Sequence, residues 1–268
     1  GAQLERGDLA DEEALRRGMR GADAVVHGAA IYAVGISAAQ RAEMFDANVR
    51  GAERVLSTAA ALGVRRILHV STIAVFGNTR GAVVDERYQR SGPYTSYYEE
   101  TKFRAHEIAR RLAERGAPIL IAQPGQVYGP GDHSGFGRFL RAFARGRLPL
   151  VPFPDLGMNL VHVDDVSDGI VRVLDRGAAG ASYPLGGEIV RVKQAFETLA
   201  RVLGRRPPRF DAPYLPLRLA ALFRADVREI LTSSRGVTFW ATDARARAEL
   251  GYAPRDLETG LRETFATG

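Results

Sequence analysis

Tyr98 and Lys102 stand four residues apart in the segment SYYEETKFRAHEIARR. On a helix, positions i and i+4 share a face, so both side chains can reach one ligand. A nearby ammonium stabilises a phenolate, and we therefore expect Lys102 to lower the pKa of Tyr98 from about 10 toward the range of a general acid or base. Thr72, in VSTIAVFG, ends a predicted buried strand and can hydrogen-bond a substrate oxygen. Together the three predict proton transfer coupled to hydride transfer.

The alternative is that tyrosine and lysine coincide by chance on a solvated helix face. The chain has only two lysines, Lys102 and Lys193, so such a pair is uncommon by composition. Neither Tyr94 nor Tyr97 has the i+4 relation to Lys102. The strand and hydroxyl upstream therefore favour the functional interpretation.

Length and composition predict an enzyme with one main domain and a smaller lobe. The 268 residues are 46% hydrophobic, which is enough for a large core. No apolar run approaches 18 residues, so we expect no membrane as partner. Cysteine is absent, which excludes disulfides and thiol nucleophiles and fits a cytoplasmic protein.

The net charge of +6 raises the possibility of nucleic-acid binding. Of the 37 basic residues 35 are arginine, and they alternate with acidic residues along predicted helices. No basic block with spaced aromatics occurs, so we interpret the excess as solvated helix faces and predict no nucleic-acid partner. RNA binding stays open as a minor alternative, which a steep loss of affinity with salt would reveal.

Strand and helix patterns alternate along the first half of the chain. Strands are predicted at 2–8, 22–30, 65–77 and 117–129, and helices at 45–63 and 97–115. Such alternation is typical of a parallel sheet covered on both faces. We therefore predict an α/β fold, a Rossmann-like doubly wound parallel sheet over residues 1–128.

After Gly129 the pattern changes to that of a smaller C-terminal α/β lobe for the substrate, residues 129–268. Residues 129–137 form a glycine-rich loop, and 204–217 are predicted to be an extended proline-rich crossing without regular structure. Residues 159–177 are a strand followed by a helix, with Asp165 as its N-cap, and we expect them to pack back on the first domain. Further elements are predicted at 139–150, 182–187, 194–204, 243–252 and 256–265.

From GDL at 7–9 to GLRET at 260–264, the chain resembles the extended short-chain dehydrogenases/reductases, the NAD-dependent epimerase/dehydratase group. The resemblance implies a catalytic set of Asn48, Thr72, Tyr98 and Lys102. It implies NAD or NADP as cofactor. The implied substrate contacts are Tyr32, Thr72, Gln126 and the loop at 130–140. The implied cofactor contacts are Asp8, Leu9, Ala29, Ala30, Ile31, Asn48, Val70, Tyr98, Lys102, Pro124, Gly125 and Val127.

Each assignment has a structural alternative. Asp8 can be a turn or capping residue before the helix at 11–19, and the small residues of HGAA can serve close packing. His162, Asp164 and Asp165, with Asp132 and His133, could be considered as metal ligands. We expect no metal site, because a capped helix and packing typical of the family account for these residues better.

Departures from the family pattern narrow the expected reaction. Family dehydratases place an acid pair after the catalytic hydroxyl, where this chain has Ile73 and Ala74, so we expect no elimination of water. Gln126 and Met158 replace residues that hold a nucleotide-sugar diphosphate, which favours a smaller or less charged substrate. We predict an NAD(P)-dependent epimerase or reductase acting on a secondary alcohol or ketone of a sugar-like or other small molecule. The alternative is a redox-inert dinucleotide sensor or scaffold.

Two expectations concern the whole molecule. In the family, helices corresponding to 44–62 and 97–115 pair into a dimer, so we expect a homodimer with Val55, Leu56, Ile108 and Leu112 at its seam. The resemblance begins at the family's third strand, so we also expect the first βαβ unit with its glycine-rich turn to be missing and dinucleotide binding to be weak.

Overall fold

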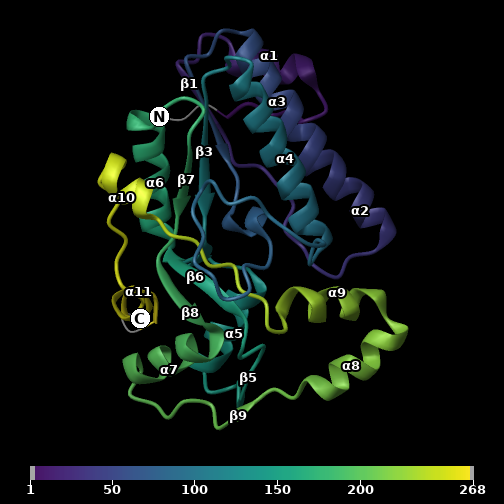
Figure 1. The fold of residues 1–268 in the computed structure, drawn as a ribbon, viewed down its shortest axis with the longest axis vertical. Coiled ribbons are helices and arrows are strands. Elements are labelled where there is room, and N and C mark those ends of the chain that lie inside the picture. Colours follow the sequence, from purple (N-terminus) through teal and green to yellow (C-terminus); the bar gives the residue numbers. More distant parts are fainter. Residues whose placement is uncertain (1–3, 266–268) are drawn as a thin grey trace.

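The structure, a computed structural model, describes residues 4–265 and has an α/β architecture (Figure 1). Its main sheet has four parallel strands in the order β1-β2-β3-β7. These strands are β1 (Ala24–His27), β2 (Arg66–Val70), β3 (Ile119–Pro124) and β7 (Ser182–Leu185). The predicted parallel Rossmann-like sheet is thereby confirmed.

Helices cover both faces of this sheet, as doubly wound folds require (Figure 1). On one face, Leu56 and Ala109 pack with Ile67 and Ile121 of the strands. On the other face, Val173 and Leu250 pack against Leu120. The helices of the first face are α3 (Gly51–Ala61) and α4 (Tyr97–Glu114), with α1 (Glu12–Met19) beside α3, and those of the second are α6 (Val163–Arg176) and α10 (Ala244–Leu250).

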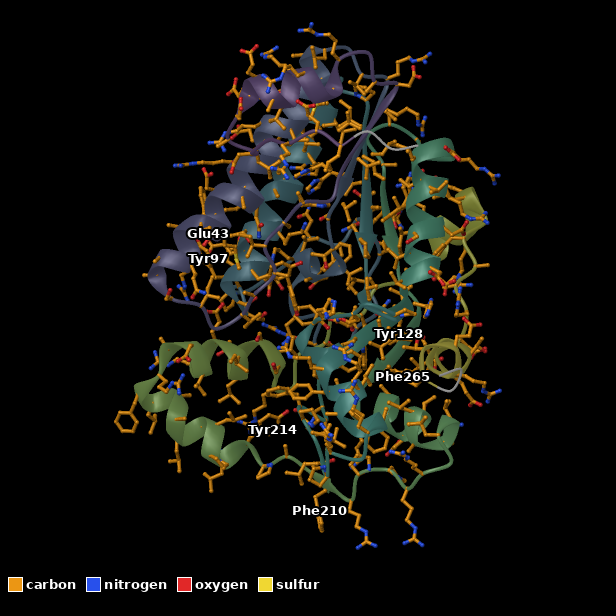
Figure 2. All side chains as sticks on the ribbon, turned by 180° about the vertical axis from the view of Figure 1, so that it is seen from behind. Glu43, Tyr97, Tyr128, Phe210, Tyr214 and Phe265 are labelled. Atoms are coloured by element: carbon orange, nitrogen blue, oxygen red, sulfur yellow. The ribbon has the colours of Figure 1, made fainter. Side chains whose placement is uncertain are left out.

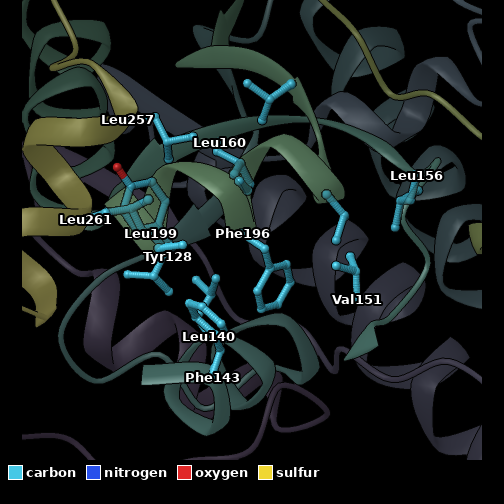
Figure 3. Packing of buried hydrophobic residues seen from close by; sticks show 14 of the residues in the cluster. Tyr128, Leu140, Phe143, Val151, Leu156, Leu160, Phe196, Leu199, Leu257 and Leu261 are labelled. Carbon is cyan, nitrogen blue, oxygen red and sulfur yellow. The ribbon is translucent and has the colours of Figure 1, made fainter. Parts of the chain in front are cut away.

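A second core lies below the main sheet. Two small sheets, β4-β6-β8 and β5-β9, pack with three helices there. Figure 3 shows their side chains, among them Tyr128, Leu140, Phe196 and Leu261, meeting in one buried cluster. The elements are β4 (Gln126–Tyr128), β5 (Leu150–Val151), β6 (Gly157–His162), β8 (Glu188–Arg191), β9 (Phe210–Asp211), α5 (Gly135–Ala144), α7 (Val192–Val202) and α11 (Leu257–Phe265).

The main sheet draws on both halves of the sequence, because β7 pairs with β3 and α6 packs on β2 and β3. The Arg66 guanidinium donates to the carbonyl oxygens of Leu174 and Gly177 at the end of α6. The helical part of 159–177 therefore packs back on the first sheet, while its strand β6 belongs to the second core. The division into 1–128 and 129–268 stays a prediction.

Three local predictions are wrong. Residues 4–8 of the strand predicted at 2–8 form no strand, and the rest of that strand lies outside the described residues. The N-cap of α6 is His162, whose Nδ1 accepts from the Asp164 amide, because the Asp165 carboxylate instead binds Arg255. The 204–217 segment contains β9 and the start of α8 (Tyr214–Phe223), since Pro216 falls in the first helical turn, where no amide donor is required.

Helix α8 and the next helix, α9 (Ala225–Ser234), form a hairpin that the sequence analysis did not predict. In Figure 1 it occupies the lower right corner, with α8 along the lower edge and α9 above it. No helix of the described chain combines the length and hydrophobicity needed to cross a bilayer.

Three of the four residues expected at a dimer seam are not on the surface, and the fourth, Leu112, is half-buried. Val55, Leu56 and Ile108 are buried within the single chain, and Leu112 packs into the same core as Leu56. Leu56 and Leu112 pack with the strand residues Ile67 and Ile121. The assigned seam is therefore wrong at Val55, Leu56 and Ile108, and the homodimer stays a prediction.

Candidate active site

Parallel strands bring their carboxyl ends to one edge of the sheet, where ligands of doubly wound folds bind. There β1 continues into residues 28–32, β2 into Thr72, and β3 into Gly125. A Cβ at position 125 would come within 2.5 Å of the Asn159 carbonyl oxygen, so only glycine fits where β3 meets the second core.

Helix α4 presents Tyr98 and Lys102 to this edge. Ser96 caps its first turn by accepting from the Glu99 amide at 3.1 Å, and Gly116, with φ of +94°, follows its last residues. The Lys102 ammonium is buried and donates to the Val70 carbonyl at the end of β2, at 2.9 Å. Burial lowers the pKa of Lys102 to about 8.

The expected effect of Lys102 on Tyr98 is absent from this structure. The pKa of Tyr98 is raised above its usual value, first by burial and then by the neighbouring Tyr32. The rings of Tyr32 and Tyr98 meet edge to face with centroids 4.7 Å apart. Lys102 is not among the groups that shift this pKa, and its ammonium donates to the Val70 carbonyl. Tyr98 is therefore a neutral phenol, ready to donate a proton.

Asn48 joins three segments of the site. It lies in a π-helical turn, Asp46–Arg50, between α2 (Ala38–Phe45) and α3. Its side chain accepts from the Ile31 amide at 2.7 Å and donates to the Ile31 carbonyl and to Thr101 Oγ1, each at 3.0 Å. Such π turns are frequent at functional sites. Asn48 thus fixes the segment carrying Tyr32 against α4, and its unfavourable position in a helix is explained.

Thr72 caps a 3₁₀ turn, Ile73–Phe76, at the end of β2. Its Oγ1 accepts from the Ala74 amide at 3.2 Å and faces the Pro124 carbonyl at 3.4 Å. These contacts fix the hydroxyl at the wall of the cavity that Tyr98 also lines.

A cavity of about 480 Å³ opens beside these residues, within the range of small-molecule sites. Its polar wall includes Tyr32, Thr72, Tyr98 and Gln126. Its remaining wall is largely apolar and includes Val34, Phe136, Phe139, Phe153, Leu156, Met158, Val192, Ile230 and Phe239. The loop predicted to face the substrate contributes Asp132, Ser134 and Gly135, which is in line with that expectation.

The cavity wall carries no cationic side chain among the residues described, and its charged members are Glu99 and Asp132. The Glu99 carboxylate is held by Arg90 at 2.5 Å and by the Thr95 amide at 3.0 Å. Asp132 Oδ1 accepts from the Ser134 amide, whereas its buried Oδ2 has no hydrogen-bond partner in the described structure. The wall is therefore suited to a hydrogen-bond donor and unsuited to an anion.

Other expected cofactor residues surround this cavity without lining it. Val70 and Pro124 contact Lys102 and Thr72 through their carbonyls, and Ala29 and Ala30 are exposed beyond β1. Leu9 lies near Gly51, just after the π turn. Asp8 is exposed, and its carboxylate accepts from the Ala10 amide at 2.8 Å. This contact is that of a turn residue, the structural alternative given for Asp8 above. The actual N-cap of α1 is Asp11.

The donor groups fit the nicotinamide-ribose half of NAD. Lys102 uses one of three ammonium donors on Val70, and Tyr98 Oη has no hydrogen-bond partner within the described chain. Two donors from α4, with Lys102 at the end of β2, suit the hydroxyls of a ribose. No group of three or more metal-ligating side chains occurs among the described residues.

Sequence reasoning missed the contribution of α9. Its residues Ile230, Ser233 and Ser234 line the cavity although more than 130 positions separate them from Tyr98. Glu229 fixes this helix, because its carboxylate accepts from the Tyr97 amide at 2.7 Å and from Arg41 at 2.8 Å. No local pattern in the sequence indicates this long-range contact.

Among known proteins, the chain is 28% identical to sterol demethylase protein B of Methylococcus capsulatus, over 99% of this chain and 84% of that protein. It is 30% identical to a 4-hydroxy-2-methyl-3-oxo-4-farnesyl-3,4-dihydroquinoline-1-oxide ketoreductase of Stigmatella aurantiaca, over 95% and 80%. Both matches extend well into the second lobe.

A solved structure with the same fold is a double mutant of dTDP-glucose 4,6-dehydratase from Streptomyces venezuelae with NAD bound. It is 26% identical, with a TM-score of 0.78 over 97% of this chain and 77% of that chain. Dehydratases also occur among the sequence relatives. The expectation that dehydration is excluded therefore has no support from these comparisons.

The family model for the NAD dependent epimerase/dehydratase family matches residues 1–186. Its members are enzymes, and solved neighbours hold NAD. This match, the fold and the Thr72, Tyr98 and Lys102 arrangement agree: the chain belongs to the NAD-dependent epimerase/dehydratase family.

Proposed function

We propose that this protein is an NAD-dependent oxidoreductase that interconverts a secondary alcohol and a ketone on an uncharged, largely apolar substrate. The observation that carries the proposal is the cavity wall, which combines Thr72 and Tyr98 with a predominantly apolar lining that has no cation among its described residues. A nucleotide sugar brings a diphosphate, for which arginine or lysine is the usual side-chain partner, and neither lines this cavity among the described residues.

In this proposal each polar side chain has one task. Tyr98, a neutral phenol, gives its proton to the carbonyl oxygen when a ketone is reduced and accepts it back when an alcohol is oxidised. Thr72 orients that oxygen, since its own hydroxyl is fixed between Ala74 and Pro124. Lys102 binds the cofactor ribose and adds positive charge near Tyr98. When bound, NAD supplies the hydride acceptor or donor for the reacting carbon.

The names of two relatives support an apolar substrate, since they refer to a sterol and to a farnesyl-bearing quinoline. The position after Thr72 supports oxidoreduction over elimination. There Ile73 and Ala74 line the cavity, so this turn offers no carboxyl for removing a proton. Epimerisation uses the same two half-reactions, and product analysis distinguishes it.

The test is a substrate panel at saturating NAD(H). It contains steroid, flavanonol and isoprenoid ketones with their alcohols, and dTDP-glucose and UDP-glucose as anionic members. We expect absorbance changes at the nicotinamide band with the apolar members and none with the nucleotide sugars. Turnover or dehydration of a nucleotide sugar contradicts the substrate class, and cofactor binding without any turnover supports the sensor alternative.

A further inference from the structure

Helix α8 exposes an apolar face. Phe223 is 89% exposed, and three leucines of this helix are also more than half exposed, Leu215, Leu219 and Leu222. Phe210, just before the helix, is 67% exposed and lies at the lower end of the molecule in Figure 2. Clustered exposure of large apolar side chains indicates an interaction surface.

The four residues of α8 lie on one side of the helix, because their spacing is i, i+4, i+7 and i+8. The opposite side packs on α9: Ala221 is buried, and the Arg228 guanidinium donates to its carbonyl at 3.0 Å. The hairpin is therefore closed on its inner side, and within the described structure the outer face has no cover.

One arginine lies on this helix, and two more lie in the segment that precedes it. Arg206, Arg209 and Arg218 are exposed and form no ion pair with another described residue. Arg218, three positions after Leu215, borders the apolar face itself. The surface of an anionic lipid bilayer has apolar acyl chains beneath negatively charged headgroups. An apolar helix face bordered by arginine is complementary to such a surface.

The same hairpin reaches the cavity. On α9, Ile230 and Ser233 line the cavity wall, and Glu229 fixes the helix to the start of α4. The exposed face of α8 therefore belongs to the element that closes one side of the site. A surface that binds lipid there would hold the cavity close to a source of apolar molecules.

We propose that the outer face of α8, with Phe210 and the three unpaired arginines, docks this protein on the surface of an anionic lipid bilayer. The docking goes beyond the proposed function and needs no membrane span. A second copy of the chain is a poorer occupant, because a two-fold contact through this face would place the unpaired Arg218 of both copies at the same apolar contact.

The experiment is co-sedimentation of the full chain with vesicles at low salt. We expect binding to phosphatidylglycerol–phosphatidylcholine vesicles, weaker binding to phosphatidylcholine alone, and release by added salt. The double variant Leu219→Ser/Phe223→Ser should bind about tenfold more weakly or worse, since it removes exposed apolar area that the bilayer would cover. The triple variant Arg206→Gln/Arg209→Gln/Arg218→Gln should lose the preference for anionic vesicles.

The matched control is Val171→Ser, which removes an apolar side chain with similar exposure on α6. It should bind vesicles like the unchanged protein, and circular dichroism verifies that all variants fold. Three results overturn the proposal: no vesicle binding, equal binding by the α8 variants, or a concentration-dependent dimer in light scattering that Leu219→Ser/Phe223→Ser dissociates. None of these readouts involves catalysis, so they are independent of the proposed reaction.

Discussion

At the scale of single residues, the chemistry of the site depends on the hydrogen-bond or packing partner of each polar side chain. Lys102 binds the Val70 carbonyl, and Tyr98 faces Tyr32 and the cavity. The phenol therefore keeps its proton at neutral pH. This favours Tyr98 as an acid in the reducing direction, whereas the reverse reaction needs a base and should gain from higher pH.

We predict that Tyr98→Phe lowers turnover by about a hundredfold or more and leaves the fold intact, because it removes only the hydroxyl that transfers the proton. Steady-state kinetics on a ketone from the panel measures the effect. Tyr97→Phe is the matched control, since Tyr97 is the adjacent residue and does not line the cavity. Similar activity of the Tyr98 variant and the control contradicts the assignment.

At the scale of elements, the π turn before α3 positions the segment beyond β1. Asn48 supplies both hydrogen bonds to the Ile31 backbone and one to Thr101 on α4. No other side chain in the described structure forms a hydrogen bond with the Ile31 amide or carbonyl. The turn therefore couples the place of Tyr32 to that of Tyr98.

Asn48→Ala should lower the free energy of unfolding by roughly 1 to 3 kcal/mol, because the half-buried Ile31 backbone and the buried Thr101 lose their hydrogen bonds to Asn48. Turnover should fall as well, since Tyr32 and Tyr98 lose their common support. Denaturant unfolding and kinetics measure the two effects. Glu53→Ala, an exposed change on α3, should alter neither, and an Asn48 variant that behaves like it would refute this role.

The sequence was informative where structure is local. The helical pattern at 97–115 predicts helix α4, and strand patterns predict β1, β2 and β3. The place of α9 could not be predicted, because it depends on Glu229 bonding Tyr97 across the fold. The direction of the Tyr98 pKa shift failed for a similar reason: it depends on the burial of Tyr98 and on Tyr32, which the fold brings beside it.

At the scale of the whole molecule, a histidine cluster under the site links stability to pH. His27 and His69 are buried and stack at 5.5 Å, and the His106 Nδ1 lies 3.0 Å from Ser71 Oγ. Burial lowers the pKa of His27 and of His106 to about 4, and that of His69 well below its usual value. In the folded protein these rings are therefore neutral at pH 7.

The direction of this pH dependence follows from the number of protons that the folded and unfolded chains bind. Between about pH 6.5 and 4 the unfolded chain binds protons that the folded chain does not, so stability must fall as pH falls. The expected slope is about 1.4 kcal/mol per pH unit for each such histidine. Thermal unfolding from pH 7 to 4 measures it. His27→Gln should flatten the slope, while His133→Gln, in the cavity-side loop, should not.

The central claim is that this chain exchanges hydride between NAD and an apolar ketone with Tyr98 as proton donor. The most direct measurement uses NADH deuterated at one face of nicotinamide C4, the panel ketone that reacts fastest, and mass spectrometry of the alcohol. We predict one deuterium in the product from one of the two labelled faces, at a rate that Tyr98→Phe reduces and Tyr97→Phe does not. An unlabelled alcohol from both faces, or no alcohol at all when NADH is bound, would contradict the account.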